Sequence, residues 1–124
     1  MTRKKATFGQ VLREARLAAG FTLRRFAAEV GISPTYLSQI EQDNIDPPTA
    51  ERVTTMAERL GAVPDEWIAL AGRLPDDLPD IIRKQPTAMP ELLRAANGLT
   101  PKQLAELTAR ARQLRERGNN GEKP

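Results

Sequence analysis

The chain has 124 residues and contains neither cysteine nor histidine. This length allows one small helical domain with an appendage, or two very small units. The missing residue types exclude disulfides, the usual zinc ligands and the Ser-His-Asp or Cys-His arrangements of many enzymes, so we expect no enzyme, metal site or cofactor. The net charge is +3, and residues 1–42 alone carry seven Lys or Arg against three Glu. A positive surface is therefore expected on the N-terminal part of the fold.

The N-terminal segment does not have the pattern of a targeting sequence. It is basic, but a polar amphipathic stretch follows it instead of the apolar run of a signal peptide. No stretch approaches the roughly 18 to 20 apolar residues of a membrane span. We expect a cytoplasmic protein without membrane contact. Arg3, Lys4 and Lys5 form a basic arm that can reach phosphates, although so short a terminus is more often only solvated.

The first predicted helix runs from Thr7 to Ala19 and is stopped by Gly20. One side of it is apolar, and its role is mainly to form core. The residues on this side are Phe8, Leu12, Ala15 and Ala19.

Residues 22–42 predict two short helices joined by a tight turn. Thr22 can cap the first helix, and Gly31 ends it because glycine enters the left-handed conformation without steric penalty. Ser33 caps the second helix, whose first position holds Pro34. The apolar positions of the two helices are Leu23, Phe26, Ala27, Val30, Leu37 and Ile40. The side chains left outward on the second helix are Thr35, Tyr36, Ser38, Gln39 and Gln42. A small residue at position 27 lets the second helix cross closely at a steep angle and project.

These residues resemble the helix-turn-helix of the Cro and phage-repressor-like (XRE) family of transcriptional regulators. The resemblance covers about residues 7–72, and its pattern is Ala27, Gly31, Leu37, Ile40 and Glu41. It implies an all-α fold with a five-helix DNA-binding domain, which we place over residues 1–72. Gly72 and the run RLPDDLPD mark a boundary, after which we expect a helical C-terminal region over residues 73–124. It also implies a structural ion pair between Arg16 and Glu41.

Two further helices complete this domain. A loop with the sequence QDNIDPPT follows Glu41, and in the family a loop at this point lies over the DNA backbone. Asp43 and Asp46 stand where basic or neutral residues are common, which would weaken a phosphate contact. A fourth helix opens at Thr49 and ends at Gly61, and a fifth runs from Pro64 to Ala71. Their apolar side chains are expected in the core: Val53, Met56, Ala57, Leu60, Trp67, Ile68 and Leu70.

The C-terminal region predicts three more helices. A short helix around Ile81 ends near Pro86, a second spans about residues 89–96, and a third opens with a capping box at Thr100 and should stop at Gly118. The acidic cluster Asp76, Asp77 and Asp80 is more often helix-capping than metal-binding. The third helix carries the apolar stripe Leu104, Leu107, Ala111 and Leu114. The apolar stripes of this region must bury against the first domain or against a second copy of the chain. We favour a homodimer, because a two-fold contact lets one surface serve both partners. The tail NNGEKP is expected to be disordered.

The resemblance assigns roles on the DNA. The second helix of the motif would enter the major groove of double-stranded DNA. Pro34 stands where a relative carries a base-reading glutamine, so base reading would fall to Thr35, Tyr36, Ser38 and Gln39. Phosphate contacts would come from Thr22, Arg24, Arg25 and Asn44; Leu23 stands where relatives commonly carry a glutamine.

The leading hypothesis is a repressor that binds a palindromic operator as a homodimer. One alternative is an antitoxin-type autoregulator, which would bind DNA by the same motif and hold a protein partner through residues 73–117. Another is a helical adaptor that never touches DNA; the basic bias of residues 1–42 argues against it.

Overall fold

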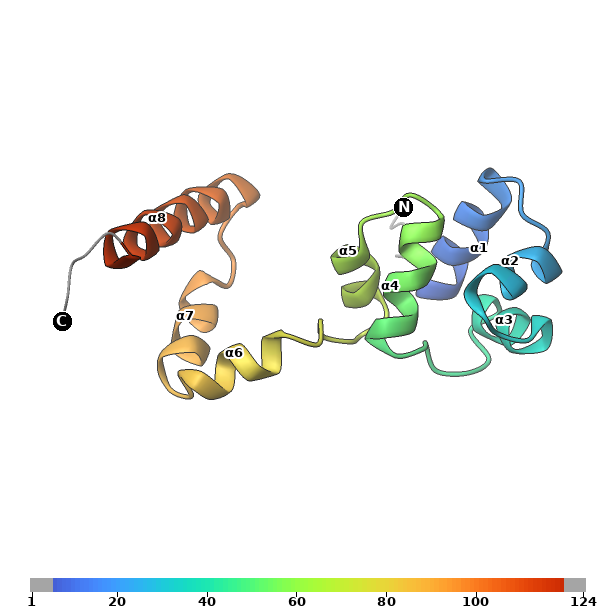
Figure 1. Cartoon of the computed structure of the whole chain (residues 1–124), viewed down its shortest axis with the longest axis horizontal. Helices are drawn as coiled ribbons and strands as arrows, with labels where there is room; N and C mark the ends of the chain where they lie inside the picture. The colour runs from blue at the N-terminus through green and yellow to red at the C-terminus, as the bar shows by residue number, and fades with distance from the viewer. Residues whose placement is uncertain (1–5, 120–124) are drawn as a thin grey trace, which may run out of the picture. The chain divides into compact units, whose positions relative to one another are not determined.

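The computed structural model describes residues 6–119, with side chains described to Gly118, and its regular elements there are all helices (Figure 1). The all-α prediction is confirmed, and the five helices of the repressor-like domain are present. In chain order the helices are α1 (Phe8–Ala18), α2 (Leu23–Val30), α3 (Pro34–Glu41), α4 (Ala50–Arg59), α5 (Pro64–Leu70), α6 (Leu78–Lys84), α7 (Ala88–Ala96) and α8 (Pro101–Asn119). The predicted basic arm and most of the tail lie outside the described residues.

Hydroxyl side chains begin the first four helices. Thr7, Thr22, Ser33 and Thr49 each accept a hydrogen bond from the backbone amide three residues later, at 3.0 to 3.4 Å. Each bond satisfies an amide that has no partner within its own helix. Helix α5 lacks such a bond and begins instead with Pro64 at its first position. Local sequence signals therefore determine where these helices start.

One hydrophobic core joins α1 to α5. Phe8 and Trp67 meet edge to face at its margin, with ring centroids 6.0 Å apart. Its largest fully buried side chains are Phe26, Leu12, Leu37, Ile40, Met56 and Val53. Two expectations are wrong: Ala19 is exposed because α1 ends one residue earlier, and Leu70 is 40% exposed in the last turn of α5. Both residues stand at the end of a helix, where apolar spacing did not predict burial.

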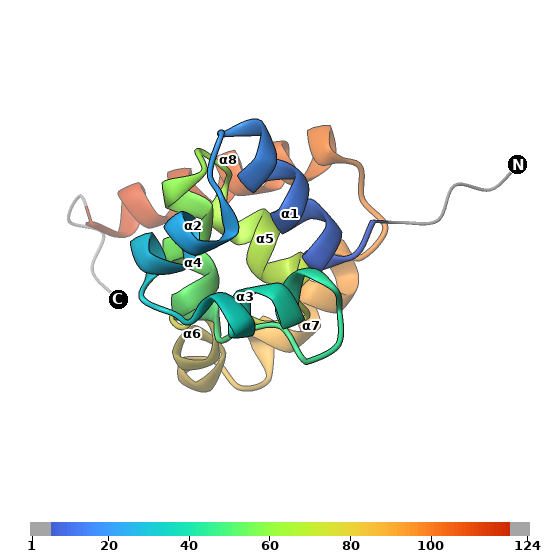
Figure 2. The ribbon, with the colours of Figure 1, turned by 90° about the vertical axis from the view of Figure 1, so that its right-hand side faces the viewer.

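Gly9 allows α1 to approach the end of α3 more closely than any other residue type would. A Cβ at this position would collide with the backbone carbonyl oxygens of Ile40 and Glu41, the latter at 2.8 Å, and with the Asp43 carboxylate at 2.5 Å. Gly9 is buried inside a helix, where glycine ordinarily costs stability. The close packing of α1 against α3 therefore depends on this missing side chain. Figure 2 looks onto α1 to α5 from the side that α3 occupies.

The chain divides into two compact units between Asp80 and Ile81. The predicted boundary between residues 72 and 73 stays a prediction, and Arg73 is still hydrogen-bonded to the first unit. In the second unit, α7 contains no buried residue and every residue of α8 up to Gly118 is exposed. The apolar side chains of this unit therefore have no core of their own.

Helix α8 begins with a reciprocal capping box. The Gln103 amide donates to the Thr100 hydroxyl at 3.1 Å, and the Thr100 amide donates to the Gln103 side chain at 3.0 Å. The predicted stop at Gly118 is wrong, because α8 continues to Asn119. Within residues 6–119, no helix is both long and apolar enough to cross a membrane, and no group of three acidic side chains is placed to hold a metal ion.

We expect Gly9→Ala to destabilise the first unit by about 1–3 kcal/mol, because the added methyl group forces α1 away from α3. The control is Gly118→Ala, where a Cβ would meet nothing within 4 Å and the helical backbone accepts alanine. Urea unfolding followed by circular dichroism measures both changes. Equal stability of the two variants would show that the contact around Gly9 yields without cost.

Candidate nucleic-acid interface

The turn between α2 and α3 fixes the angle between these two helices. Gly31 has φ 75° and ψ 34°, a left-handed conformation that glycine adopts without strain. The Ile32 amide donates to the Ala27 carbonyl at 2.9 Å and closes the end of α2. Ala27 is itself fully buried where α2 and α3 pack together. A short turn and a small side chain thus hold the two helices in one arrangement.

The expected base-reading residues lie on α3, whose Leu37 and Ile40 face the core. Their exposure differs from one to the next. Thr35 is exposed, whereas Tyr36, Ser38 and Gln39 are partly exposed. The Tyr36 ring also packs against the core, which leaves it less free than the other three.

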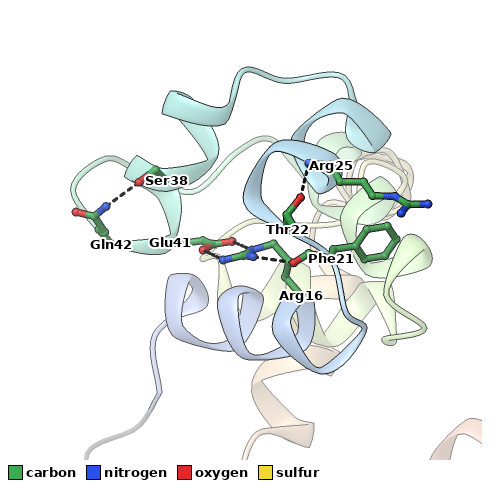
Figure 3. Close-up of polar contacts among 7 residues, drawn as sticks. All are labelled: Arg16, Phe21, Thr22, Arg25, Ser38, Glu41 and Gln42. Carbon is green, nitrogen blue, oxygen red and sulfur yellow. Dashed lines mark hydrogen bonds and ion pairs between the residues drawn. The ribbon is translucent and has the colours of Figure 1, made fainter.

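Gln42 was not among the expected site residues, yet it bonds to one of them. Its side-chain amide donates to the Ser38 hydroxyl oxygen at 2.7 Å, as Figure 3 shows. The Asn44 side chain in turn donates to Gln42 at 3.4 Å. Because Ser38 accepts this bond, its own hydroxyl hydrogen is left to donate elsewhere. The spacing of four residues on one helix was the signal that could have predicted the pair.

The N-terminus of α2 presents a second polar surface. The Thr22 hydroxyl accepts from the Arg25 amide at 3.1 Å, so the amides of Leu23 and Arg24, in the first turn, have no partner within the helix. Arg24 and Arg25 are exposed. In Figure 3 the Arg25 guanidinium points away from the domain's buried ion pair. Unpaired amides, a hydroxyl and two cations together make this helix end suitable for an anion.

The buried ion pair joins Arg16 of α1 to Glu41, the last residue of α3. Arg16 donates twice to the Glu41 carboxylate, at 2.7 and 2.9 Å, and once to the Phe21 carbonyl at 2.9 Å. The two side chains are 8% and 4% exposed. The hydrogen bond to Glu41 raises the pKa of Arg16 above its ordinary value, although burial opposes this. Arg16 therefore stays charged and holds α1, α3 and the α1–α2 turn together.

Asp43 does not stand free beside the interface, as its sequence position suggested. Its φ is 59°, and its carboxylate accepts hydrogen bonds from the Thr7 hydroxyl at 2.6 Å and the Gly9 amide at 3.2 Å. The negative charge thus lies at the N-terminus of α1, where it is stabilising. The Asp43 side chain is a structural link between α1 and the end of α3.

Asn44 also differs from expectation in one respect. Its backbone amide donates to the Gln39 carbonyl at 3.0 Å and completes the end of α3. The Asn44 amide is therefore already paired within the protein. Only the exposed Asn44 side chain is left for such a contact.

A helix with a polar outer side, fixed by a glycine turn and a buried ion pair, follows a helix whose N-terminus suits an anion. These are the features of a helix-turn-helix domain. The sequence model of the helix-turn-helix family matches residues 12–68. These residues belong to the Cro and phage-repressor-like (XRE) helix-turn-helix family of DNA-binding transcription regulators. Among curated proteins no sequence matches the chain significantly.

Several solved structures resemble parts of the chain. The clp gene regulator ClgR from C. glutamicum is 31% identical over 52% of this chain and 83% of its own, with a TM-score of 0.45. The biofilm regulator SinR, solved in complex with DNA, is 22% identical over 50% of this chain and 98% of its own, with a TM-score of 0.47. A complex of SinR and SinI is 19% identical over 89% of this chain and 99% of that one, with a TM-score of 0.48. All three TM-scores lie below 0.5, so the family assignment rests on sequence.

We expect Arg16→Met to destabilise the first unit by about 3–5 kcal/mol, because it leaves the Glu41 carboxylate buried without its partner. The double variant Arg16→Met/Glu41→Leu removes both charges and should regain most of this loss. Urea midpoints of the wild type, the single variant and the double variant provide the comparison. A double variant no more stable than the single one would show that packing around Arg16, and not the pairing of charges, is what matters.

Proposed function

We propose that the protein is a sequence-specific regulator of transcription that binds double-stranded DNA, acting as a repressor and as a homodimer on a palindromic operator. The observation that carries this proposal is the two-sided character of α3. Its inner side is fixed by Leu37, Ile40 and the buried carboxylate of Glu41, while Thr35 is exposed and Ser38 and Gln39 partly so. A rigid helix with a polar outer face fits the major groove.

Base reading falls to the outer face of α3. The Gln39 amide can donate and accept at once, which matches the edge of adenine. Ser38 accepts from Gln42 and keeps its own O–H to donate, so it can bond a base acceptor such as guanine O6 or thymine O4. Thr35, near the N-terminus of α3, and Tyr36 complete the set. Pro34 has no N–H and contributes none of these hydrogen bonds.

Phosphate binding falls to the N-terminus of α2 and to the loop after α3. The unpaired amides of Leu23 and Arg24 and the Thr22 hydroxyl would receive one phosphate, with Arg24 and Arg25 supplying positive charge. The Asn44 side chain would contact another. These contacts orient α3 and carry no sequence information of their own.

Dimerisation is assigned to α8. Along this helix the apolar positions Leu104, Leu107, Ala111 and Leu114 follow one another at steps of three, four and three residues. This spacing is the same in both directions, so two antiparallel copies would place Leu104 opposite Leu114 of the partner. Leu104, Leu107 and Leu114 are 42%, 37% and 52% exposed within one chain. A dimer that joins two reading helices would supply the discrimination that one module lacks.

An antitoxin-type autoregulator is the second candidate, with a protein partner bound by the C-terminal region. Residues 81–119 carry eight Lys or Arg and three Glu, a net +5. Like charge opposes self-association and favours an acidic partner. Co-purification of a stoichiometric acidic protein with the native chain would support this candidate over the homodimer.

We expect Gln39→Ala to weaken binding to the selected operator by about 1–3 kcal/mol and to leave binding to random duplex nearly unchanged, because only a base contact is lost. Arg25→Ala is the matched comparison: it should weaken both duplexes and lower the salt dependence by about one unit of slope. Selection from a random duplex pool supplies the operator, and fluorescence anisotropy measures affinity. Equal losses on both duplexes would remove Gln39 from base reading.

We expect Leu107→Asp to convert the dimer to a monomer in sedimentation, because a charge enters the apolar contact. Ala109→Asp places the same charge on the opposite face of α8 and should leave the dimer intact. The two variants carry equal net charge, so a difference between them reports the face of the helix. A dimer that survives in both would exclude the α8 stripe as the interface.

A further inference from the structure

Arg73 lies where the chain leaves α5 and turns toward α6. Gly72, with φ 71°, ends α5, and the Arg73 amide donates to the Ile68 carbonyl at 3.0 Å. This closure fixes the backbone of Arg73 on the first unit. Its side chain extends to the loop that connects α3 to α4.

The Arg73 guanidinium binds two consecutive backbone carbonyls of that loop. Nη2 donates to the Pro47 oxygen at 2.6 Å, and Nε donates to the Pro48 oxygen at 3.1 Å. Proline has no N–H, so these oxygens are the only backbone hydrogen-bonding groups of the two residues. The two donors are held in one plane, a geometry that a lysine cannot reproduce. The bond is therefore specific to arginine.

The same loop is held at its other end by Asp43, through its bonds to Thr7 and Gly9. Between these two attachments lie Asn44, Ile45 and Asp46, all of them exposed. The loop thus presents Asn44 from two fixed ends. One end is bound to α1, and the other to Arg73, three residues beyond α5.

We propose that Arg73 is a positioning residue for DNA binding: it holds the loop after α3 so that Asn44 meets a phosphate. This inference rests on the proposed function. Arg73 acts through the loop and not through the DNA, since two of its nitrogens already bind protein carbonyls. Its loss weakens binding to every duplex alike, because a phosphate contact carries no sequence information.

Three variants test the proposal. Arg73→Lys keeps the charge and loses the paired geometry, and Arg73→Ala loses both. Arg59→Ala is the control, because it removes the same charge from the first unit but breaks only an exposed pair with Glu29, at 3.5 Å. Hydrogen exchange at the Asp43 and Asn44 amides of the DNA-free protein reports the loop. Duplex affinity as a function of salt, at a temperature where all variants are folded, reports DNA binding.

We expect exchange at these amides to be about tenfold faster in Arg73→Ala, because two charge-assisted bonds to the loop are lost. Arg73→Lys should show a smaller increase, and Arg59→Ala none. Affinity for operator and random duplex should fall together, by about three- to tenfold in Arg73→Lys, with the salt slope unchanged because no cation leaves a phosphate.

Two outcomes would overturn the inference while leaving the proposed function standing. Unchanged affinity in Arg73→Lys and Arg73→Ala, despite faster exchange, would reduce Arg73 to a purely stabilising role. A salt slope lower by about one in Arg73→Ala alone, with Arg73→Lys like the wild type, would place its charge at a phosphate instead. If the wild type binds no duplex in a salt-dependent way, the proposed function fails and the inference fails with it.

Discussion

The bond between the Arg16 guanidinium and the Glu41 carboxylate determines where α3 can lie. It joins the last turn of α1 to the last residue of α3, and both charges are almost completely removed from solvent. A buried charge without its partner is strongly unfavourable, so any displacement of α3 that separates the two groups is resisted. The third bond, to the Phe21 carbonyl, extends this constraint to the segment that leads into α2. The Arg16 guanidinium thus binds both the end of α3 and the segment before α2, and it constrains the orientation of both helices.

Other constraints gather at the same end of α3. Gly9 admits the carbonyls of Ile40 and Glu41, and the carboxylate of Asp43 binds the first turn of α1. The N-terminal end of α3 is held differently, by the glycine turn and the Ser33 cap. In the proposed function, the N-terminal half of α3 would lie nearest the bases, while its C-terminal end is held rigidly by the domain. Its direction would be set before any DNA is met.

Local signals predicted the helices well, and long-range contacts account for what was missed. Thr22, Gly31 and Ser33 act through hydrogen bonds to residues a few positions away, so their roles can be predicted from the local sequence. Position 9 requires glycine because the backbone carbonyls of Ile40 and Glu41, more than 30 positions along the chain, lie against it. No local sequence pattern predicts this contact. Asp43 and Arg73 are similar cases, because each bonds to residues at least 25 positions away. The bond from Gln42 to Ser38 could have been predicted, since the two are only four positions apart.

The capping box of α8 bears on how the second unit would meet its partner. Thr100 and Gln103 satisfy each other's backbone amides without help from any other helix, and the leucines of α8 stand on a helix that is already formed. Ordering a chain during association consumes free energy, and a segment formed in advance avoids that loss. Two such helices would then associate without folding first. The association rate would depend on their orientation and on charge repulsion more than on coil-to-helix conversion.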